Sequence, residues 1–99
     1  MKSEPIALRT FTCLANEIAH EVRTVLYAPI EADGAYGCRF AVEGPTINLV
    51  EDITIFGHDG FQAIQLAMFI LRNTLITTSG TSNWRWLGQD EFGLPTSAS

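Results

Sequence analysis

The sequence predicts a small α+β domain: an antiparallel sheet of about four strands with one amphipathic helix packed on one face (ββββα), then a short extended C-terminal segment. Three observations predict it. Several stretches in the first half alternate apolar and polar residues, which is the period of a half-buried strand. Turn-forming residues separate these stretches. A later segment repeats its apolar residues with the period of a helix instead.

The first two strands are expected at Ile6–Leu14 and Glu21–Ala28, joined by a turn over residues 15–20. Both stretches are rich in residues that favour strands. Pro29 stops the second strand because proline cannot donate a hydrogen bond to a neighbouring strand.

The third strand is expected at Tyr36–Glu43, after a turn at Asp33-Gly34, a dipeptide that tolerates positive φ. Its alternation is the clearest in the chain. A fourth strand is expected within Ile47–Phe56, where Glu51-Asp52 indicates a bulge or a break. The residues of the third strand that share the apolar face are Tyr36, Cys38, Phe40 and Val42.

The helix is expected from Gly60 to about Leu75, with the polar stretch 77–83 ending it. Asp59 is a good N-cap, and Gln62 three residues later completes a capping box. A rotation of about 100° per residue gathers one broad apolar arc. Its members are Ala63, Ile64, Leu66, Ala67, Ile70, Leu71 and Leu75.

The predicted core joins this arc to the third strand, so Phe40, Ile64, Ala67 and Leu71 should be buried together. Phe69 falls in the polar stripe of the helix. An exposed aromatic there is either ordinary surface or a contact with a partner.

The segment Trp84–Leu87 is expected to be extended, so Trp84 and Trp86 share one face. Leaving both in water would forgo a large hydrophobic contribution. One should therefore pack on the end of the core, and the other should lie at its rim, open to a partner or ligand. Residues 1–95 form the single predicted domain, and 96–99 a disordered tail.

Composition narrows the class of partner. The formal net charge is −5, with 6 basic and 11 acidic side chains, which argues against nucleic-acid binding. No apolar run is long enough for a membrane span or a signal core, so a cytoplasmic protein without membrane contact is expected. Cys13 and Cys38 lack the spacing of a zinc or redox motif and are interpreted as small buried hydrophobes.

No catalytic, metal or cofactor motif is found, so no cofactor is predicted and enzyme activity is disfavoured. Glu17, His20 and Glu21 have ligand-type side chains, but the first two would share a face only on a helix, and here a turn is expected. His58 and Asp59 stand at the start of the helix. Asp59 occupies the anion position there as the cap and brings its own negative charge.

The sheet face away from the helix is the most informative predicted surface. Arg39 points there if Phe40 faces the helix. If Ile6/Leu8 and Val22/Leu26 also face the helix, arginines and aromatics gather on the outer face, as in protein interfaces. The alternative is a solvated face neutralised by acidic side chains, and a slip of one residue would reverse a strand. The residues concerned are Arg9, Phe11, Arg23, Val25, Tyr27 and Arg39.

The segment 56–67 (FGHDGFQAIQLA) resembles the G-x-D-x-x-Q-A-L-x-L-A signature of a family of small bacterial proteins known only as a domain of unknown function. Residues 6–10 (IALRT), Pro29, the pattern Tyr36-x-Cys38-x-Phe40 and the closing Gly93-Leu94-Pro95 are similar to other parts of its pattern. Ile64 stands where that pattern has leucine. The resemblance implies a ββββα domain. It does not point to any particular activity.

The leading hypothesis is a non-enzymatic protein-interaction module, either self-associating as a homo-oligomer or acting as an acidic inhibitor or immunity-type protein. The alternative is a small-ligand-binding domain with a pocket between helix and sheet, lined by Tyr36, Phe40, Trp84 and Trp86. The predicted interface residues are Arg9, Phe11, Arg23, Tyr27, Arg39, Phe69, Trp84 and Trp86.

Overall fold

The computed structural model describes residues 4–44, 49–79, 83–89 and 92–97. The α+β class with an antiparallel sheet and one helix is confirmed, but the sheet has six strands rather than about four. The two additional strands are the short β3 and β6. The elements are β1 (Pro5–Ala15), β2 (Ile18–Tyr27), β3 (Ile30–Ala32), β4 (Ala35–Gly44), β5 (Leu49–Gly57), α1 (Gly60–Ser79) and β6 (Trp84–Arg85).

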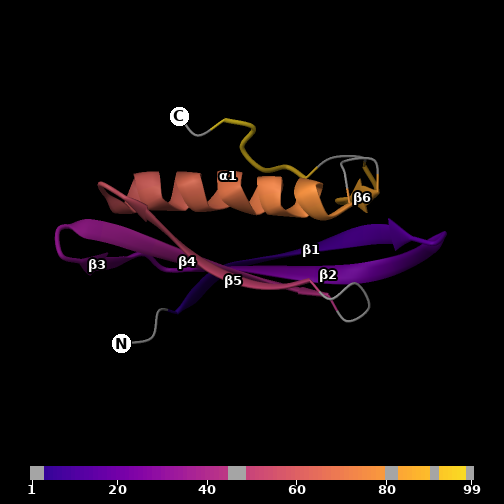
Figure 1. Cartoon of the computed structure of the whole chain (residues 1–99), viewed down its shortest axis with the longest axis horizontal. Coiled ribbons are helices and arrows are strands. Elements are labelled where there is room, and N and C mark those ends of the chain that lie inside the picture. Colours follow the sequence, from indigo (N-terminus) through magenta and orange to yellow (C-terminus); the bar gives the residue numbers. More distant parts are fainter. Residues whose placement is uncertain (1–3, 45–48, 80–82, 90–91, 98–99) are drawn as a thin grey trace.

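β4 organises the sheet. It pairs with β5 along one edge and with both β2 and β3 along the other. β2 and β3 therefore lie end to end along the same edge of β4, separated by Ala28-Pro29. The strand ends just before Pro29, as predicted, but its pairing with β4 resumes at Ile30. β1 pairs with β2, and β6 adds to β1 at Thr12 and Cys13. α1 and the C-terminal segment lie on the same side of this sheet (Figure 1).

Two-residue turns join β1 to β2 and β3 to β4. Asp33-Gly34 has φ values of 52° and 83°, as its sequence predicts. Asn16-Glu17, with φ values of 53° and 66°, forms the first turn, so the predicted turn over 15–20 is too long. Two successive residues with positive φ match the right-handed twist of the paired strands, which allows β2 to begin already at Ile18.

The predicted orientation of the first strand is wrong. Phe11 and Cys13 are fully buried on the helix side, whereas Ile6 and Leu8 are 52% and 57% exposed. The strand carries apolar residues on both faces, so alternation alone could not decide between them. The orientation follows from the aromatic Phe11, which packs in the core. The predicted orientation of β2 is right, because Val22 is fully buried.

The predicted bulge in the fourth strand is also wrong for the described residues. β5 pairs residue by residue with β4, from Gly57 opposite Tyr36 to Leu49 opposite Gly44. Asp52 fits this regular strand because it lies on the face away from α1, where its carboxylate meets the Arg39 guanidinium at 3.0 Å. Residues 47–48 of the predicted strand lie outside the described part of the chain.

α1 continues to Ser79, beyond the predicted end near Leu75. Thr77 is accommodated within the helix, where its Oγ1 donates to the Asn73 carbonyl at 2.8 Å. At its start, a Cβ on Gly57 would lie 2.6 Å from the Ala63 nitrogen. Glycine at the end of β5 thus brings the sheet close to the first turn of the helix.

The core lies between the sheet and α1, and the predicted burial is confirmed for Phe40, Ala67 and Leu71, with Ile64 partly buried beside them. The C-terminal segment completes the core through Phe92. Residues 98–99 of the predicted disordered tail lie outside the described residues. The fully or almost fully buried apolar residues are Phe11, Cys13, Val22, Cys38, Phe40, Val42, Ala63, Ala67, Leu71, Leu75, Trp84 and Phe92.

The N-cap gives a direct prediction. Asp59 Oδ1 accepts a hydrogen bond from the Gln62 nitrogen at 2.8 Å, and Gln62 Oε1 accepts one from the His58 nitrogen at 2.6 Å. Asp59→Ala removes the first bond and should lower the free energy of unfolding by about 1 kcal/mol in urea denaturation. Asp59→Asn keeps an acceptor and is the control. An unchanged midpoint for the alanine variant would contradict this role.

Candidate functional site

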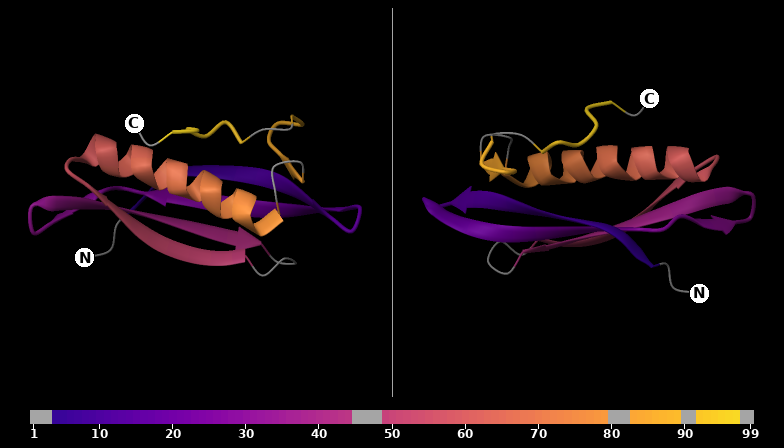
Figure 2. Two further views of the ribbon diagram at one scale, coloured as in Figure 1. Left: turned by 45° about the horizontal axis from the view of Figure 1, so that its top comes forward. Right: turned by 180° about the vertical axis from the view of Figure 1, so that it is seen from behind.

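One face of the sheet is uncovered by any described segment (Figure 2). Alternation and strand register place on it every second residue of β1, β2, β4 and β5. We call this surface the open face. Its residues are Leu8, Thr10 and Thr12 of β1, Glu21, Arg23, Val25 and Tyr27 of β2, Gly37, Arg39, Ala41 and Glu43 of β4, and Asp52, Thr54 and Phe56 of β5.

The centre of the open face is apolar. Leu8 lies opposite Val25, and Val25 lies opposite Ala41, so three strands contribute one continuous apolar row. Towards the end of β5, the 59% exposed Phe56 lies against Gly37, with a ring carbon 3.0 Å from the position of a Cβ there. Leu8 and Phe56 were not among the predicted interface residues, although the alternation would have included Leu8 in the correct orientation.

Charged groups flank the Val25 and Ala41 part of this apolar row. The Arg39 guanidinium stacks on the Tyr27 ring, 3.8 Å from its centroid, and bonds to Asp52. Arg23 lies opposite Glu43. The face holds two arginines and three carboxylates, the third being Glu21, so it is close to neutral although the chain carries −5. Arg23, Tyr27 and Arg39 thus lie together on one surface.

Arg9 lies on the other side of the sheet. Its guanidinium stacks on the Trp86 ring, 3.9 Å from the centroid, and donates from Nη1 to the carbonyls of Phe92 and Gly93 at 2.9 Å each. Its placement beside Arg23 and Arg39 is therefore wrong, for the reason given for β1. Trp86 is partly exposed at the rim of the core, as predicted.

Phe11 and Trp84 offer no surface to a partner, because both are fully buried. They form an aromatic cluster with Phe92, in which Phe11 meets the other two rings edge-on at centroid distances of 6.3 and 5.6 Å. The indole nitrogen of Trp84 donates to the Leu75 carbonyl at 3.1 Å. Both residues are core rather than interface. Phe69, another predicted interface residue, is half-buried on α1.

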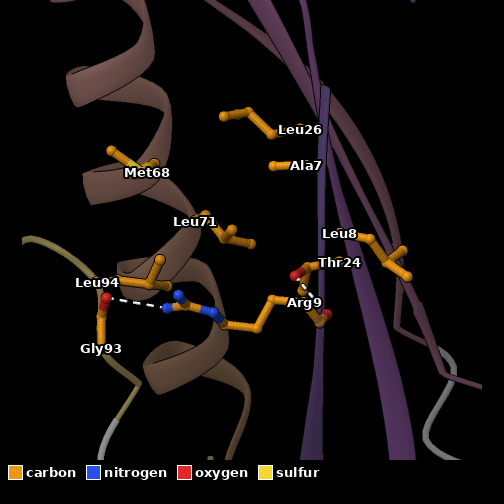
Figure 3. A pocket seen from close by; sticks show the side chains of 9 residues that line it. All are labelled: Ala7, Leu8, Arg9, Thr24, Leu26, Met68, Leu71, Gly93 and Leu94. Atoms are coloured by element: carbon orange, nitrogen blue, oxygen red, sulfur yellow. Dashed lines mark hydrogen bonds between the residues drawn. The ribbon is translucent and has the colours of Figure 1, made fainter. Parts of the chain in front are cut away.

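A groove opens between β1 and α1 (Figure 3). Its volume is about 130 Å³. Ala7 and Leu26 point into it from the sheet, whereas the Leu8 side chain points away from the helix, so its main chain borders the groove. Arg9 crosses one end to reach Gly93. The lining residues are Ala7, Leu8, Arg9, Thr24, Leu26, Met68, Leu71, Gly93 and Leu94.

This groove is not the predicted ligand pocket. Two of the four residues expected to line that pocket, Phe40 and Trp84, have no exposed surface. Their side chains fill the layer between helix and sheet, so they line no accessible space. The groove lies instead where α1, which packs on β4 and β5, leaves the first part of β1 uncovered.

The ionisable groups of the described residues do not assemble a reactive centre. Burial raises the pKa of the Cys38 thiol, whose Sγ donates to the Tyr27 carbonyl at 3.3 Å. The negative charge of Glu31, then a hydrogen bond to it, raise the pKa of Tyr36, with smaller effects of burial and of Asp59. Both groups are therefore neutral at pH 7 and poor nucleophiles.

Metal-type side chains are similarly dispersed. Within residues 4–44, 49–79, 83–89 and 92–97, no three histidine, cysteine or acidic side chains come together to hold a metal ion. Glu17 lies in the first turn, and His20 and Glu21 point to opposite faces of β2. No helix of the described chain combines the length and apolar character needed to cross a membrane.

Fold and surfaces together define a two-layer α+β domain with one uncovered sheet face and a shallow groove at the sheet edge. Comparison with protein families then assigns the domain to one family. The chain belongs to the family described as Domain of unknown function (DUF6968), which it matches over residues 7–96. Comparisons with curated proteins and with solved structures returned no match.

Proposed function

We propose that this protein is a non-enzymatic interaction module that associates with a second copy of itself through the open face. The observation that carries the proposal is the apolar row of Leu8, Val25 and Ala41, which lies on the uncovered face with charged side chains on both sides of its inner part. An apolar centre with a polar rim is the usual anatomy of a protein interface.

The dimensions of the molecule support this role. The domain measures 46 × 27 × 20 Å. Helix and sheet are stacked along the intermediate dimension, so the sheet extends along the longest and the shortest ones (Figure 1). Such a face can supply the roughly 800 Å² per partner that stable complexes bury. Tyr27 and Arg39 belong to the residue types enriched in interfaces, and their stacking holds both side chains in place before association.

The nearly balanced charge of the open face favours a second copy of this chain over a basic protein as the partner. An inhibitor of a basic protein needs an acidic docking face, because charge complementarity accelerates encounter. The open face instead nearly balances its arginines and carboxylates, so it is complementary to itself. In a two-fold dimer the Arg23 and Arg39 side chains of one copy can meet carboxylates of the other.

Light scattering coupled to size-exclusion chromatography tests the proposal. The wild-type chain of 10.9 kDa should elute at twice that mass. Ala41→Lys places a long charged side chain in the centre of the open face and should give a monomer. Gln65→Lys makes the same charge change on the exposed side of α1 and should remain dimeric. A wild-type monomer at high concentration, or a dimeric Ala41→Lys variant, would refute self-association.

The proposed setting is the cytoplasm of a bacterium. Cys13 and Cys38 are both buried thiols within the core, as is usual in reducing compartments. The resemblance of the helix start to small bacterial proteins supports the same assignment.

A further inference from the structure

We infer that the outer edge of β1 and the adjoining groove bind an extended peptide segment that carries an acidic residue two positions before an apolar one. The peptide adds to the sheet as an antiparallel strand beside Ala7–Thr10, and its apolar side chain enters the groove. This site is separate from the open face and does not depend on self-association.

Main-chain groups on this edge point outward without a partner strand. Among the described residues, β1 from Pro5 to Phe11 pairs with β2 alone. The Leu14 nitrogen donates outward to the Asn83 carbonyl at 2.8 Å. Main-chain groups alternate in direction along a strand, so those of Thr10 and Leu8 point outward as well. An exposed strand edge of this kind is a template for one further strand.

The size of the groove indicates what enters it. Its volume of about 130 Å³ is well below the roughly 300–1,000 Å³ of pockets for drug-sized ligands and cofactors. A dry engineered cavity of about 150 Å³ is known to hold a benzene molecule. The groove therefore accommodates one apolar side chain of leucine size. Met68, Leu71 and Leu94 supply apolar contacts for it (Figure 3).

The chain already contains one example of this binding mode. β6 lies on the same edge of β1, with Trp84 opposite Cys13. Its main chain extends the sheet while the Trp84 ring enters the core against Phe11. The proposed peptide repeats this arrangement on the neighbouring part of β1, with a smaller side chain in the shallower space.

Arg9 determines the charge of the peptide. Its guanidinium has five N–H donors, and the carbonyls of Phe92 and Gly93 accept hydrogen bonds from one nitrogen, Nη1. Stacking on Trp86 holds the group at the end of the groove. A carboxylate opposite Arg9 can therefore form a charge-assisted hydrogen bond.

Register then fixes the sequence pattern of the peptide. Ala7, Arg9, Phe11 and Cys13 face the helix, so a peptide residue opposite Ala7 or Arg9 faces it too. In an antiparallel strand the residue opposite Arg9 comes two positions before the residue opposite Ala7. The acidic side chain consequently precedes the apolar one, as acidic-x-apolar.

The test is an NMR titration of the Ala41→Lys variant with the blocked peptide acetyl-TVETLTV-amide. This variant removes self-association as a variable. The largest shifts should occur at the amides of Leu8 and Thr10 and at the side chains of Met68 and Leu94. Replacing the peptide leucine by glycine should weaken binding about 10- to 100-fold, the loss expected for one buried side chain. Absence of binding, or shifts confined to the open-face residues of β2, β4 and β5, would overturn the inference.

Two modifications test the main-chain pairing. Thr10→Pro removes an outward N–H without removing a bond to β2 and should abolish the titration, whereas Thr10→Val should bind like the parent. If Thr10→Pro lowers the melting temperature, methylation of the peptide nitrogen opposite Leu8 makes the same test on the intact protein. Unchanged affinity for the methylated peptide would show that no strand is added.

Discussion

Trp84→Ala is expected to lower the free energy of unfolding by about 3–5 kcal/mol, the range for truncating a large buried aromatic. The ring has no exposed surface and contacts both Phe11 and Phe92, so its removal leaves a cavity. The Leu75 carbonyl also loses its indole donor. Chemical denaturation followed by circular dichroism measures the change.

Two variants separate the contributions at this position. Trp84→Phe keeps an aromatic ring but not the N–H group, so it should cost less than the alanine variant. Trp86→Ala changes the partly exposed tryptophan at the rim and should also cost less than Trp84→Ala, although Arg9 loses its stacking partner. Equal losses for Trp84→Ala and Trp86→Ala would contradict the assignment of Trp84 to the core.

Leu71→Ala is expected to cost about 2–5 kcal/mol. Leu71 is 4% exposed in the middle of the helix face that meets the sheet, in the same buried cluster as Phe40 and Ala67. One side of its chain also lines the groove, and water entering there would partly fill the space and limit the loss. Thermal and urea unfolding of the Leu71→Ala variant measure this loss of stability.

Phe61→Ala is the matched helix control, because Phe61 is 83% exposed. Exposed substitutions away from special features usually change stability by less than about 0.5 kcal/mol. A Leu71→Ala variant as stable as Phe61→Ala would show that the helix presents a different face to the sheet.

Local signals in the sequence were sufficient for the start and the buried face of the helix, the turn at Asp33-Gly34 and the orientation of β4. In each case the information lies within a few residues: the bonds of Asp59 and Gln62 form inside one turn, and the apolar residues of β4 all fall on one face. The extent of the pairing along this edge of β4 was harder to predict, because Pro29 interrupts the chain between β2 and β3 and the pairing resumes at Ile30.

The orientation of β1 depended on residues distant in the sequence. Leu8 and Phe11 are both apolar and fall on opposite faces, so the strand has no intrinsic preference. The choice is made by Trp84 and Phe92, which cover the face of Phe11 from the other end of the chain. For the same reason, the prediction for Arg9 names the wrong surface and the sequence does not reveal the groove beside it. Arg23, Tyr27 and Arg39 do lie on one face, as predicted.

The dependence of β1 on the C-terminal segment has a consequence during synthesis. Arg9 donates to Gly93 across 84 positions of sequence, and Phe11 is covered by Phe92. A nascent chain can form the β1–β2 hairpin early, but the Phe11 side of that hairpin stays exposed until Trp84 and Phe92 have left the ribosome. Such exposed apolar surface makes partly made chains prone to aggregate. Ribosome stalling after α1 but before Trp84 and Phe92 emerge should therefore produce a chain that needs a chaperone, although β1 to β5 have already been translated.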